Sequence, residues 1–201
     1  MARSRSAEGT VARLGPADGE LLLDIAEMVI RVGTQGGRSP GVDATRLPEA
    51  LCEERGAFVT VLVDGQLNGC IGMIDPDEPL GVSIAQLAAQ AAFDDPRLPA
   101  LRRDQLGRTE IDISLLSPHH EVPARTRAEL LAQLTPGHHG LIIASRGRRA
   151  VFLPSVWNQL PDPDDFVDHL FRKAGLSATP WPADLRADLF TAECFARRLA
   201  S

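Results

Sequence analysis

Cysteine is scarce in this chain of 201 residues: only Cys52, Cys70 and Cys194 occur, and they lie far apart. An odd number of widely spaced cysteines argues against a disulfide framework, so we expect a reducing, cytoplasmic environment. The sequence has no apolar run of the roughly 20 residues that a membrane-spanning helix needs. Residues 1–6 are basic but precede no apolar segment, so we expect no secretory signal and predict a disordered tail over residues 1–15.

The sequence contains no concentrated basic stretch of the kind that binds nucleic acid. The formal net charge is -6, and the arginines are scattered among acidic residues without forming a basic stripe. Because clustered cations are what recognise a nucleic-acid backbone, we expect no nucleic-acid partner. The lack of a long apolar run likewise predicts no membrane partner.

Signatures of the common cofactor sites are also missing. The pair Gly36-Gly37 is not followed by the Gly-Lys-Ser/Thr of a phosphate-binding loop, and the sequence has no Rossmann fingerprint, iron–sulfur motif or Gly-x-Ser-x-Gly elbow. Histidines occur as two adjacent pairs, 119–120 and 138–139, and neighbours in a strand or loop point apart. No Cys-x-x-Cys or His-Glu-x-x-His spacing occurs, so we expect neither a metal site nor a cofactor.

The composition that is present is typical of a globular protein, with 44% hydrophobic and 24% charged residues. A chain of this length can bury one sizeable core, so we expect a single domain over residues 16–201. Segments with helical and with strand character alternate irregularly along it. This mixture predicts an α+β fold, in which helices flank a largely antiparallel sheet.

A hairpin is the clearest structural feature of the sequence. Residues 57–63 are β-branched and apolar, and residues 66–74 return with similar character. Between them stands Asp64-Gly65, which suits a two-residue turn whose twist matches that of the strands. The second predicted strand carries Cys70.

Helix signals stand on either side of this hairpin. Apolar residues at helical spacing predict a helix over residues 18–32, with Asp18 as its N-cap and Gly33 after its end. Capping-box patterns predict two further helices, which begin after Ser83 and after Thr126.

The C-terminal half contains one more strong helix signal. Asp162, followed by proline and two acidic residues, predicts a helix that Gly175 ends. The tail, residues 185–199, is ambiguous between helix and strand. Further strands are predicted over residues 110–116, 139–144 and 149–153.

The Cys70 segment is the most informative stretch for function. Gly69 and Gly72 stand on either side of the thiol, and glycine allows a ligand or another chain to approach the backbone. Exposed amide groups beside a sulfur suit a thiolate or a bound anion. The alternative is a small buried cysteine in a strand that bends.

Polar residues alternate with apolar ones along the strand predicted over residues 110–116. Glu110, Asp112 and Ser114 share one face of it. Such a face is commonly solvated, but two carboxylates and a hydroxyl in line would also suit the wall of a cleft.

A cysteine nucleophile needs a base, commonly a histidine that the fold brings near. His119, His138 and His139 are candidates, and nothing in the sequence chooses among them. Arg97 and Lys173 are candidates for holding an anionic substrate; their ordinary roles are a surface ion pair and a helix C-terminal cation.

Several motifs together resemble one known family. Residues 67–72, Leu-Asn-Gly-Cys-Ile-Gly, resemble the Leu-Arg-Gly-Cys-Ile-Gly signature of the AMMECR domain family. Residues 91–97 resemble its Ala-rich helix ending in Asp-x-Arg-Phe, and residues 110–118 resemble its Glu-x-x-Val-Ser-Val-Leu-Ser strand. Later motifs follow in the family's order across most of residues 20–196, namely residues 140–143, 151–154, 166–176 and Trp181.

The resemblance implies one α+β domain of two lobes, with a cleft near the segment that carries Cys70. Bacterial members, often named AmmeMemoRadiSam system protein A, tend to accompany a Memo-like protein and a radical-SAM-type protein. These two proteins are therefore the partners that the resemblance implies. It implies no particular reaction, because the biochemical role of the family is not well established.

The sequence departs from the family pattern at positions that bear on a ligand. Asn68 stands where the family has arginine, and asparagine cannot replace a cation that forms two-pronged contacts with an anion. A ligand of this protein would then differ or rely on Arg97 or Arg149. Leu98 and Ser155 replace a phenylalanine and a glutamine of the pattern.

Two hypotheses follow. In the first, the protein is an enzyme or an enzyme component, and Cys70 is a nucleophile or substrate-holding thiol in a small-molecule cleft. In the second, it is a non-catalytic interaction module in which Cys70 is structural. The residues expected at the cleft are Asn68, Gly69, Gly72, Asp95, Arg97, Glu110 and Ser114.

Overall fold

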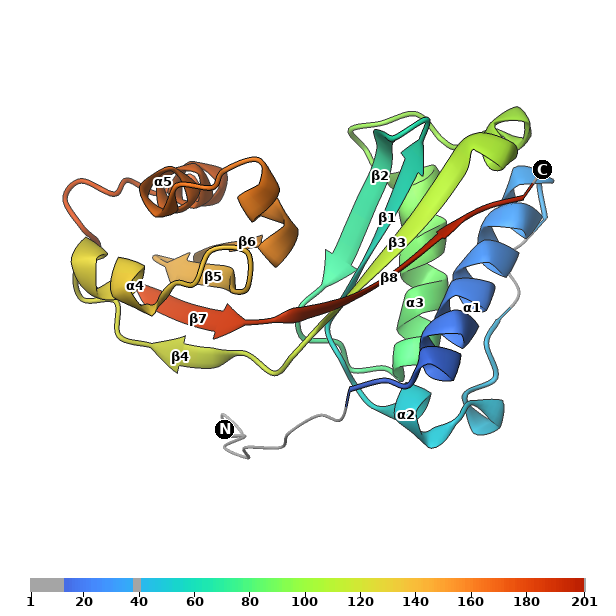
Figure 1. Ribbon diagram of the computed structural model, residues 1–201, viewed down its shortest axis with the longest axis horizontal. Helices are drawn as coiled ribbons and strands as arrows, with labels where there is room; N and C mark the ends of the chain where they lie inside the picture. The colour runs from blue at the N-terminus through green and yellow to red at the C-terminus, as the bar shows by residue number, and fades with distance from the viewer. Residues whose placement is uncertain (1–12, 38–40, 201) are drawn as a thin grey trace. The chain divides into compact units, whose positions relative to one another are not determined.

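The computed structural model describes residues 13–37 and 41–200. The chain divides into two compact units, the first formed by residues 1–116 and 193–201 and the second by residues 117–192. Each unit has its own four-stranded sheet and its own hydrophobic core (Figure 1). The α+β class and the largely antiparallel pairing predicted from the sequence are confirmed.

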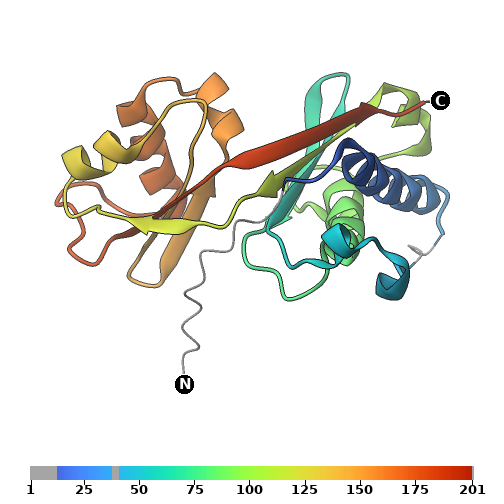
Figure 2. The ribbon, with the colours of Figure 1, turned by 60° about the horizontal axis from the view of Figure 1, so that its bottom comes forward.

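The first unit packs two long helices on one face of its sheet, as Figures 1 and 2 show. The strand order is β2-β1-β3-β8. Val59, Val61, Ile111 and Ile113 are fully buried on the helix side and form the core with apolar residues of the helices. The elements are α1 (Pro16–Thr34), α2 (Glu49–Cys52), α3 (Leu80–Ala89), β1 (Ala57–Val63), β2 (Gln66–Met73), β3 (Thr109–Leu116) and β8 (Ala192–Arg198).

The sheet has a second face, the outer face, on the side opposite the helices. Strand residues alternate between the two faces, so the neighbours of the buried valines and isoleucines in β1 and β3 project from the outer face. It carries Thr60, Cys70, Gly72, Asp112 and Ser114. Sequence alternation thus predicted the polar face of β3 correctly.

Tight turns close the predicted hairpin and join the strands predicted over residues 139–144 and 149–153 into a second one. Asp64 and Gly65 have φ angles of 52° and 74°, as the turn between β1 and β2 requires. Arg146 and Gly147 have φ angles of 52° and 71° and join the second hairpin in the same way.

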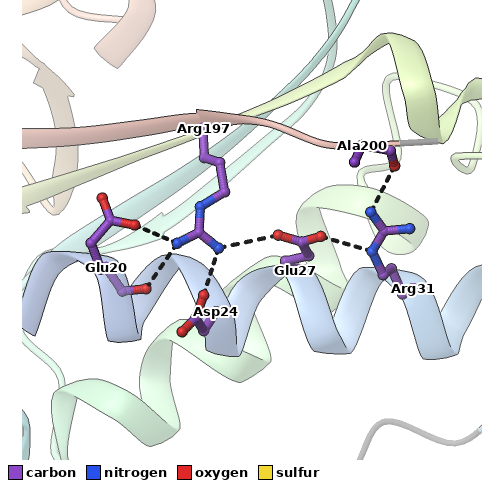
Figure 3. A network of polar contacts seen from close by, with 6 residues as sticks. All are labelled: Glu20, Asp24, Glu27, Arg31, Arg197 and Ala200. Atoms are coloured by element: carbon purple, nitrogen blue, oxygen red, sulfur yellow. Dashed lines mark hydrogen bonds and ion pairs between the residues drawn. The ribbon is translucent and has the colours of Figure 1, made fainter. Parts of the chain in front are cut away.

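An ion-pair cluster fixes the C-terminal strand β8 to helix α1 (Figure 3). The Arg31 guanidinium binds the Glu27 carboxylate at 2.8 Å and the Ala200 carbonyl at 2.7 Å. The Arg197 guanidinium lies 2.5, 2.6 and 3.1 Å from the carboxylates of Glu20, Asp24 and Glu27 respectively.

The second unit packs its helices on a sheet of order β4-β7-β5-β6. The rings of Trp157 and Phe166 stack in its core with centroids 3.8 Å apart. Its helix α5 has the predicted ends: Asp162 caps it, and Gly175 follows with φ 67°. The elements are β4 (His120–Val122), α4 (Arg127–Gln133), β5 (Gly140–Ser145), β6 (Arg148–Phe152), α5 (Pro163–Ala174) and β7 (Arg186–Phe190).

Two predicted helix starts were wrong. Helix α1 begins at Pro16 after the N-cap Gly15, and the Asp18 carboxylate accepts a hydrogen bond from the Gly15 amide at 3.3 Å, so it lies inside the first turn. Helix α3 begins at Leu80, so Ser83 lies within the helix, where it is buried. The cap predicted at Thr126 was right, because its hydroxyl accepts from the Glu129 amide.

The ambiguous tail forms the two strands β7 and β8. Of the tail predicted to be disordered, residues 1–12 lie outside the described part of the chain. None of the helices within residues 13–37 and 41–200 combines the length and apolar character that crossing a membrane requires.

Candidate functional site on the outer face of the first sheet

A β-bulge in strand β2 determines where Cys70 points. Next to the turn, Leu62 on β1 is paired with Leu67 on β2. The next residue of β1, Val61, is paired with Gly69, so Asn68 has no partner on β1. Had the initial register continued, Cys70 would stand opposite the buried Val59 and face the core. The extra residue shifts the register by one and moves Cys70 to the outer face.

The Cys70 thiol therefore belongs to a row of polar side chains across three strands. Cys70 is paired with Thr60, which in turn is paired with Asp112. The Thr60 hydroxyl lies 3.3 Å from the Cys70 sulfur and donates a hydrogen bond to it. Cys70 and Asp112 are two strand spacings apart, about 10 Å.

The main chain of Cys70 is bound by two residues from the segment after helix α3. The Asp95 carboxylate accepts a hydrogen bond from the Cys70 amide at 3.0 Å, and the Arg97 guanidinium donates to the Cys70 carbonyl at 3.0 Å. These contacts cover the edge of strand β2 much as another strand would. The Cys70 amide is therefore not available to hold an anion.

Asp95 and Arg97 also bind each other. Their carboxylate and guanidinium approach to 2.6 Å; the Asp95 side chain is 1% exposed and that of Arg97 is 62% exposed. The Arg97 guanidinium, together with the Cys70 amide, holds the pKa of the Asp95 carboxyl well below its usual range. Asp95 is thus an ionised, buried group that positions both Arg97 and the Cys70 backbone.

Both glycines of the motif admit neighbouring protein groups. A Cβ on Gly69 would overlap the carbonyl oxygen of Ala91, in the π-helical turn that follows α3. A Cβ on Gly72 would overlap the ring of Phe58, which lies across it on the outer face. Close packing therefore accounts for glycine at both positions.

Asp112 lies in a partly buried, polar environment. The Ser114 hydroxyl lies 3.3 Å from its carboxylate and 3.5 Å from the Cys194 sulfur on strand β8. Burial raises the pKa of the Asp112 carboxyl, and the nearby Glu110 adds to this effect, whereas the Ser114 hydrogen bond opposes it. A carboxyl group shifted in this direction can donate a hydrogen bond to a ligand at a higher pH than a solvated one.

Comparisons with known proteins place the chain in a family. The AMMECR1 family model matches residues 23–195. The chain belongs to the AMMECR1 family. A protein of Methanosarcina acetivorans is 34% identical to it over 186 residues, which cover 90% of this chain and 92% of that protein. A protein of Methanothermobacter thermautotrophicus is 31% identical over 166 residues, which cover 82% and 86% of the two chains.

A solved structure has a similar fold. The crystal structure of the uncharacterised protein PH0010 from Pyrococcus horikoshii superimposes on this AMMECR1-family chain with a TM-score of 0.83. The match covers 92% of this chain and 94% of PH0010, at 26% sequence identity. The two proteins therefore share the arrangement of strands that creates the outer face.

The remaining site residues predicted from the sequence lie as follows. Asn68 is 7% exposed, and its side-chain amide lies 3.4 Å from the Pro99 carbonyl oxygen. Glu110 is half-buried and paired with Leu62, at the end of β3 nearest the first turn. The candidate bases and additional cations belong to the second unit, namely His119, His138, His139, Arg149 and Lys173.

Metal ligation finds no support in the part of the chain that the structure describes. Over those residues, no group of three or more histidine, cysteine, aspartate or glutamate side chains is close enough together to hold a metal ion.

Two residues of the site were missed by sequence reasoning. Thr60 is one, and its signal was available: on a half-buried strand it alternates with Val59 and Val61. Its position opposite Cys70 depends on the bulge, which no local pattern reveals. Cys194 is the other, and its approach to Ser114 depends on the pairing of β3 with a strand from the end of the chain.

Proposed function

We propose that the outer face of the first sheet is a small-molecule-binding or catalytic site organised around Cys70. The observation that carries the proposal is the bulge at Asn68, which moves the thiol from the core side of the sheet to the polar side. Bulges are common beside active sites, where they redirect a side chain. A cysteine needed only for packing could lie on the core side of the sheet, where the regular register would place it.

The groups around the thiol suit a polar ligand. Thr60 donates a hydrogen bond to the sulfur, which stabilises developing negative charge there. The exposed Arg97 guanidinium carries a positive charge at the adjacent strand edge. Asp112 would contact the far end of a ligand lying above Thr60. In this arrangement Cys70 would hold the ligand or attack its electrophilic carbon.

The proposed cellular setting rests on the family resemblance. We propose that the protein acts in the cytoplasm with a Memo-like protein and a radical-SAM-type protein, as part of an AmmeMemoRadiSam system. The site on the first sheet would then bind a substrate, product or intermediate that these partners share.

A second candidate function is a non-catalytic interaction module. The observation in its favour is that protein groups already occupy the Cys70 amide and carbonyl and the space above Gly69 and Gly72. On this hypothesis, Cys70 is structural, and surface residues of the module make the contacts with its partners.

Variants of Cys70 and Cys52 distinguish the two functions. Wild type, Cys70→Ala, Cys70→Ser and the control Cys52→Ala would be screened for thermal shifts with a library of polar metabolites. The site proposal expects at least one compound that stabilises wild type and Cys52→Ala but not Cys70→Ala. In a system reconstituted with both partners, Cys70→Ala should abolish turnover and Cys70→Ser should reduce it severely. Full turnover by both Cys70 variants would exclude a catalytic thiol and favour the interaction module.

A further inference from the structure

A histidine side chain closes the turn between helix α4 and strand β5 in the second unit. The carbonyl of Thr135 accepts hydrogen bonds from the amides of His138 and His139, each at 3.1 Å. Gly137 lies within this reversal and has a φ of 76°. The His139 imidazole folds back over the turn, and its Nδ1 atom accepts a hydrogen bond from the Thr135 amide at 3.1 Å. Both main-chain polar groups of Thr135 are therefore bound within the turn.

The hydrogen bond from Thr135 requires a neutral His139. A main-chain amide can only donate, and a ring nitrogen accepts only when it carries no proton. A proton on the Nδ1 atom of His139 would place two donors opposite each other, and the Thr135 amide would lose its partner. The closed turn is therefore incompatible with a charged imidazole at this position.

The groups around His139 also oppose a positive charge on its ring. Partial burial lowers the pKa of His139, and the neighbouring imidazoles of His138 and His120 act in the same direction. The ring of His138 lies in the same turn, with its centroid 5.0 Å from that of His139, and His120 belongs to the edge strand β4. From the end of α4, the Gln133 carbonyl opposes the shift. Among the residues that the structure describes, no carboxylate contributes to this pKa.

The turn is connected to the core of the second unit through its main chain. The indole of Trp157, on the short helix Pro154–Asn158, donates a hydrogen bond to the His139 carbonyl at 2.7 Å. Trp157 is buried and stacks on the ring of Phe166. Leu134, at the start of the turn, packs against the same core. A rearrangement of the main chain at His139 therefore reaches a buried aromatic side chain.

We propose that the turn formed by residues 134–139 is an acid-sensitive latch, which neutral His139 holds closed and protonated His139 releases. Protonation removes the hydrogen bond from the Thr135 amide and adds a positive charge beside the rings of His138 and His120. The end of α4 then loses one of its connections to the start of β5. The latch lies within the second unit, and the inference does not depend on the Cys70 site.

The direction of the pKa shift fixes the pH range in which the latch opens. Because the pKa of His139 is lowered in the folded protein, the closed turn has its full stability above the pKa of an unfolded histidine, roughly 6.5. This stability declines as pH falls below that value. The turn is therefore closed at neutral pH and opens in mildly acidic solution.

Nuclear magnetic resonance of the isotope-labelled full chain, titrated from neutral to mildly acidic pH, tests the proposal. The signals of the Thr135 amide and the Trp157 indole should shift together with those of the His139 ring, with a midpoint below roughly 6.5. Exchange of the Thr135 amide with solvent would be corrected for the intrinsic effect of pH. It should be about three- to tenfold faster at the acidic end, because the turn has lost one hydrogen bond.

Histidine variants separate the latch from other effects of acid. His139→Gln offers a side-chain oxygen to the Thr135 amide but does not titrate, so the shifts of Thr135 and Trp157 with pH should disappear. The matched control is His169→Gln on α5, which removes a histidine of the same unit and should keep the wild-type titration. If His139→Gln does not fold, His138→Gln at an exposed position serves instead; it removes a neighbouring positive charge and should move the midpoint to higher pH.

The outcomes decide for or against the latch. Coupled shifts of Thr135, Trp157 and His139 that His169→Gln keeps and His139→Gln removes support it. A Thr135 amide that stays unchanged while His139 titrates would overturn it, as would shifts that persist in His139→Gln or an unmoved midpoint in His138→Gln. Amide signals of both units that change together over the same pH range would also overturn it, because they would indicate general unfolding by acid.

Discussion

Asp95 is the residue whose replacement most sharply tests the described geometry. Its two carboxylate oxygens accept from the Cys70 amide, the Arg97 amide and the Arg97 guanidinium. In Asp95→Asn one oxygen becomes an amino group, which cannot accept, and the negative charge is lost. At least one buried donor is then left facing another donor.

The cost follows from the burial of these contacts. A hydrogen bond to a charged group contributes about 1.5–3 kcal/mol. The hydrogen bond from the buried Cys70 amide should contribute this full free energy. Those from the exposed Arg97 guanidinium contribute less, because water screens them. We therefore expect a loss of about 2–4 kcal/mol at pH 7, which corresponds to a fall in melting temperature of about 5–15 °C for a chain of this size.

The loss should depend on pH in a defined direction. The pKa of Asp95 is lowered in the folded protein, so its stabilisation is present above the pKa of an unfolded aspartate and declines as pH falls towards the folded value. Urea denaturation at pH 7 and near pH 3 should show a smaller difference between wild type and Asp95→Asn at the lower pH.

A matched control uses a similar ion pair at the surface. Asp104 pairs with Arg102 at 3.1 Å, and both side chains are about two-thirds exposed, at 65% and 67%. Asp104→Asn should leave the unfolding midpoint unchanged. Equal unfolding midpoints for Asp95→Asn and Asp104→Asn would refute this role of Asp95. So would a difference in unfolding free energy between wild type and Asp95→Asn that stays the same at pH 7 and pH 3.

Three further perturbations have definite expected outcomes. Gly69→Ala should destabilise the protein by about 1–3 kcal/mol in urea denaturation, because the alanine Cβ would overlap the Ala91 carbonyl. Unchanged stability would mean that the π-helical turn moves freely. Arg197→Ala should cost about 1–2 kcal/mol at low salt and less at high salt, since it removes ion pairs with three carboxylates of α1; a loss independent of salt would contradict an ionic role. Asp112→Asn should be more stable than wild type at pH 7, because the raised pKa of Asp112 makes the folded wild type lose stability as pH rises. The gain in stability should disappear below about pH 4, where the Asp112 carboxyl is protonated in both states. A gain that persists at low pH would contradict this cause.

Local sequence signals predicted the parts of the fold that local chemistry determines. The turn at Asp64-Gly65 needs two residues with positive φ, and helix α5 needs the oxygen of Asp162 before it and a residue such as Gly175 after it. Each of these requirements is met within a few neighbouring residues. The sequence therefore located the hairpin and this helix correctly.

Helix starts were less predictable where several capping patterns competed. Ser83 has the spacing of a capping box, but the helix already begins at Leu80, where the preceding Pro79 has an extended backbone that suits an N-cap position. Asp18 has a carboxylate that can cap a helix, but it lies inside the first turn, where it accepts a hydrogen bond from the Gly15 amide. In both cases the residue type was informative and its position in the helix was not.

The candidate site depends on pairing between distant segments, which local patterns do not specify. The glycines around Cys70, the charge of Arg97 and the resemblance to the AMMECR family together singled out Cys70, Asp95 and Arg97, and the structure brings these three residues into contact. None of these signals gave a reason to associate Thr60 with them. The bulge at Asn68 decides which face Cys70 occupies, and a shift of one residue is not visible in hydrophobic alternation.

The most direct test of the central claim is the rate at which iodoacetamide alkylates Cys70 in the folded protein, followed by peptide mass spectrometry across neutral pH. Cys52 and Cys194 serve as internal controls, and Thr60→Val removes the hydroxyl that donates to the sulfur. Cys70 should be labelled in the native state near neutral pH faster than both controls, and more slowly in Thr60→Val. Labelling of Cys70 only after unfolding would contradict a reactive thiol on the outer face and leave the interaction module as the better explanation.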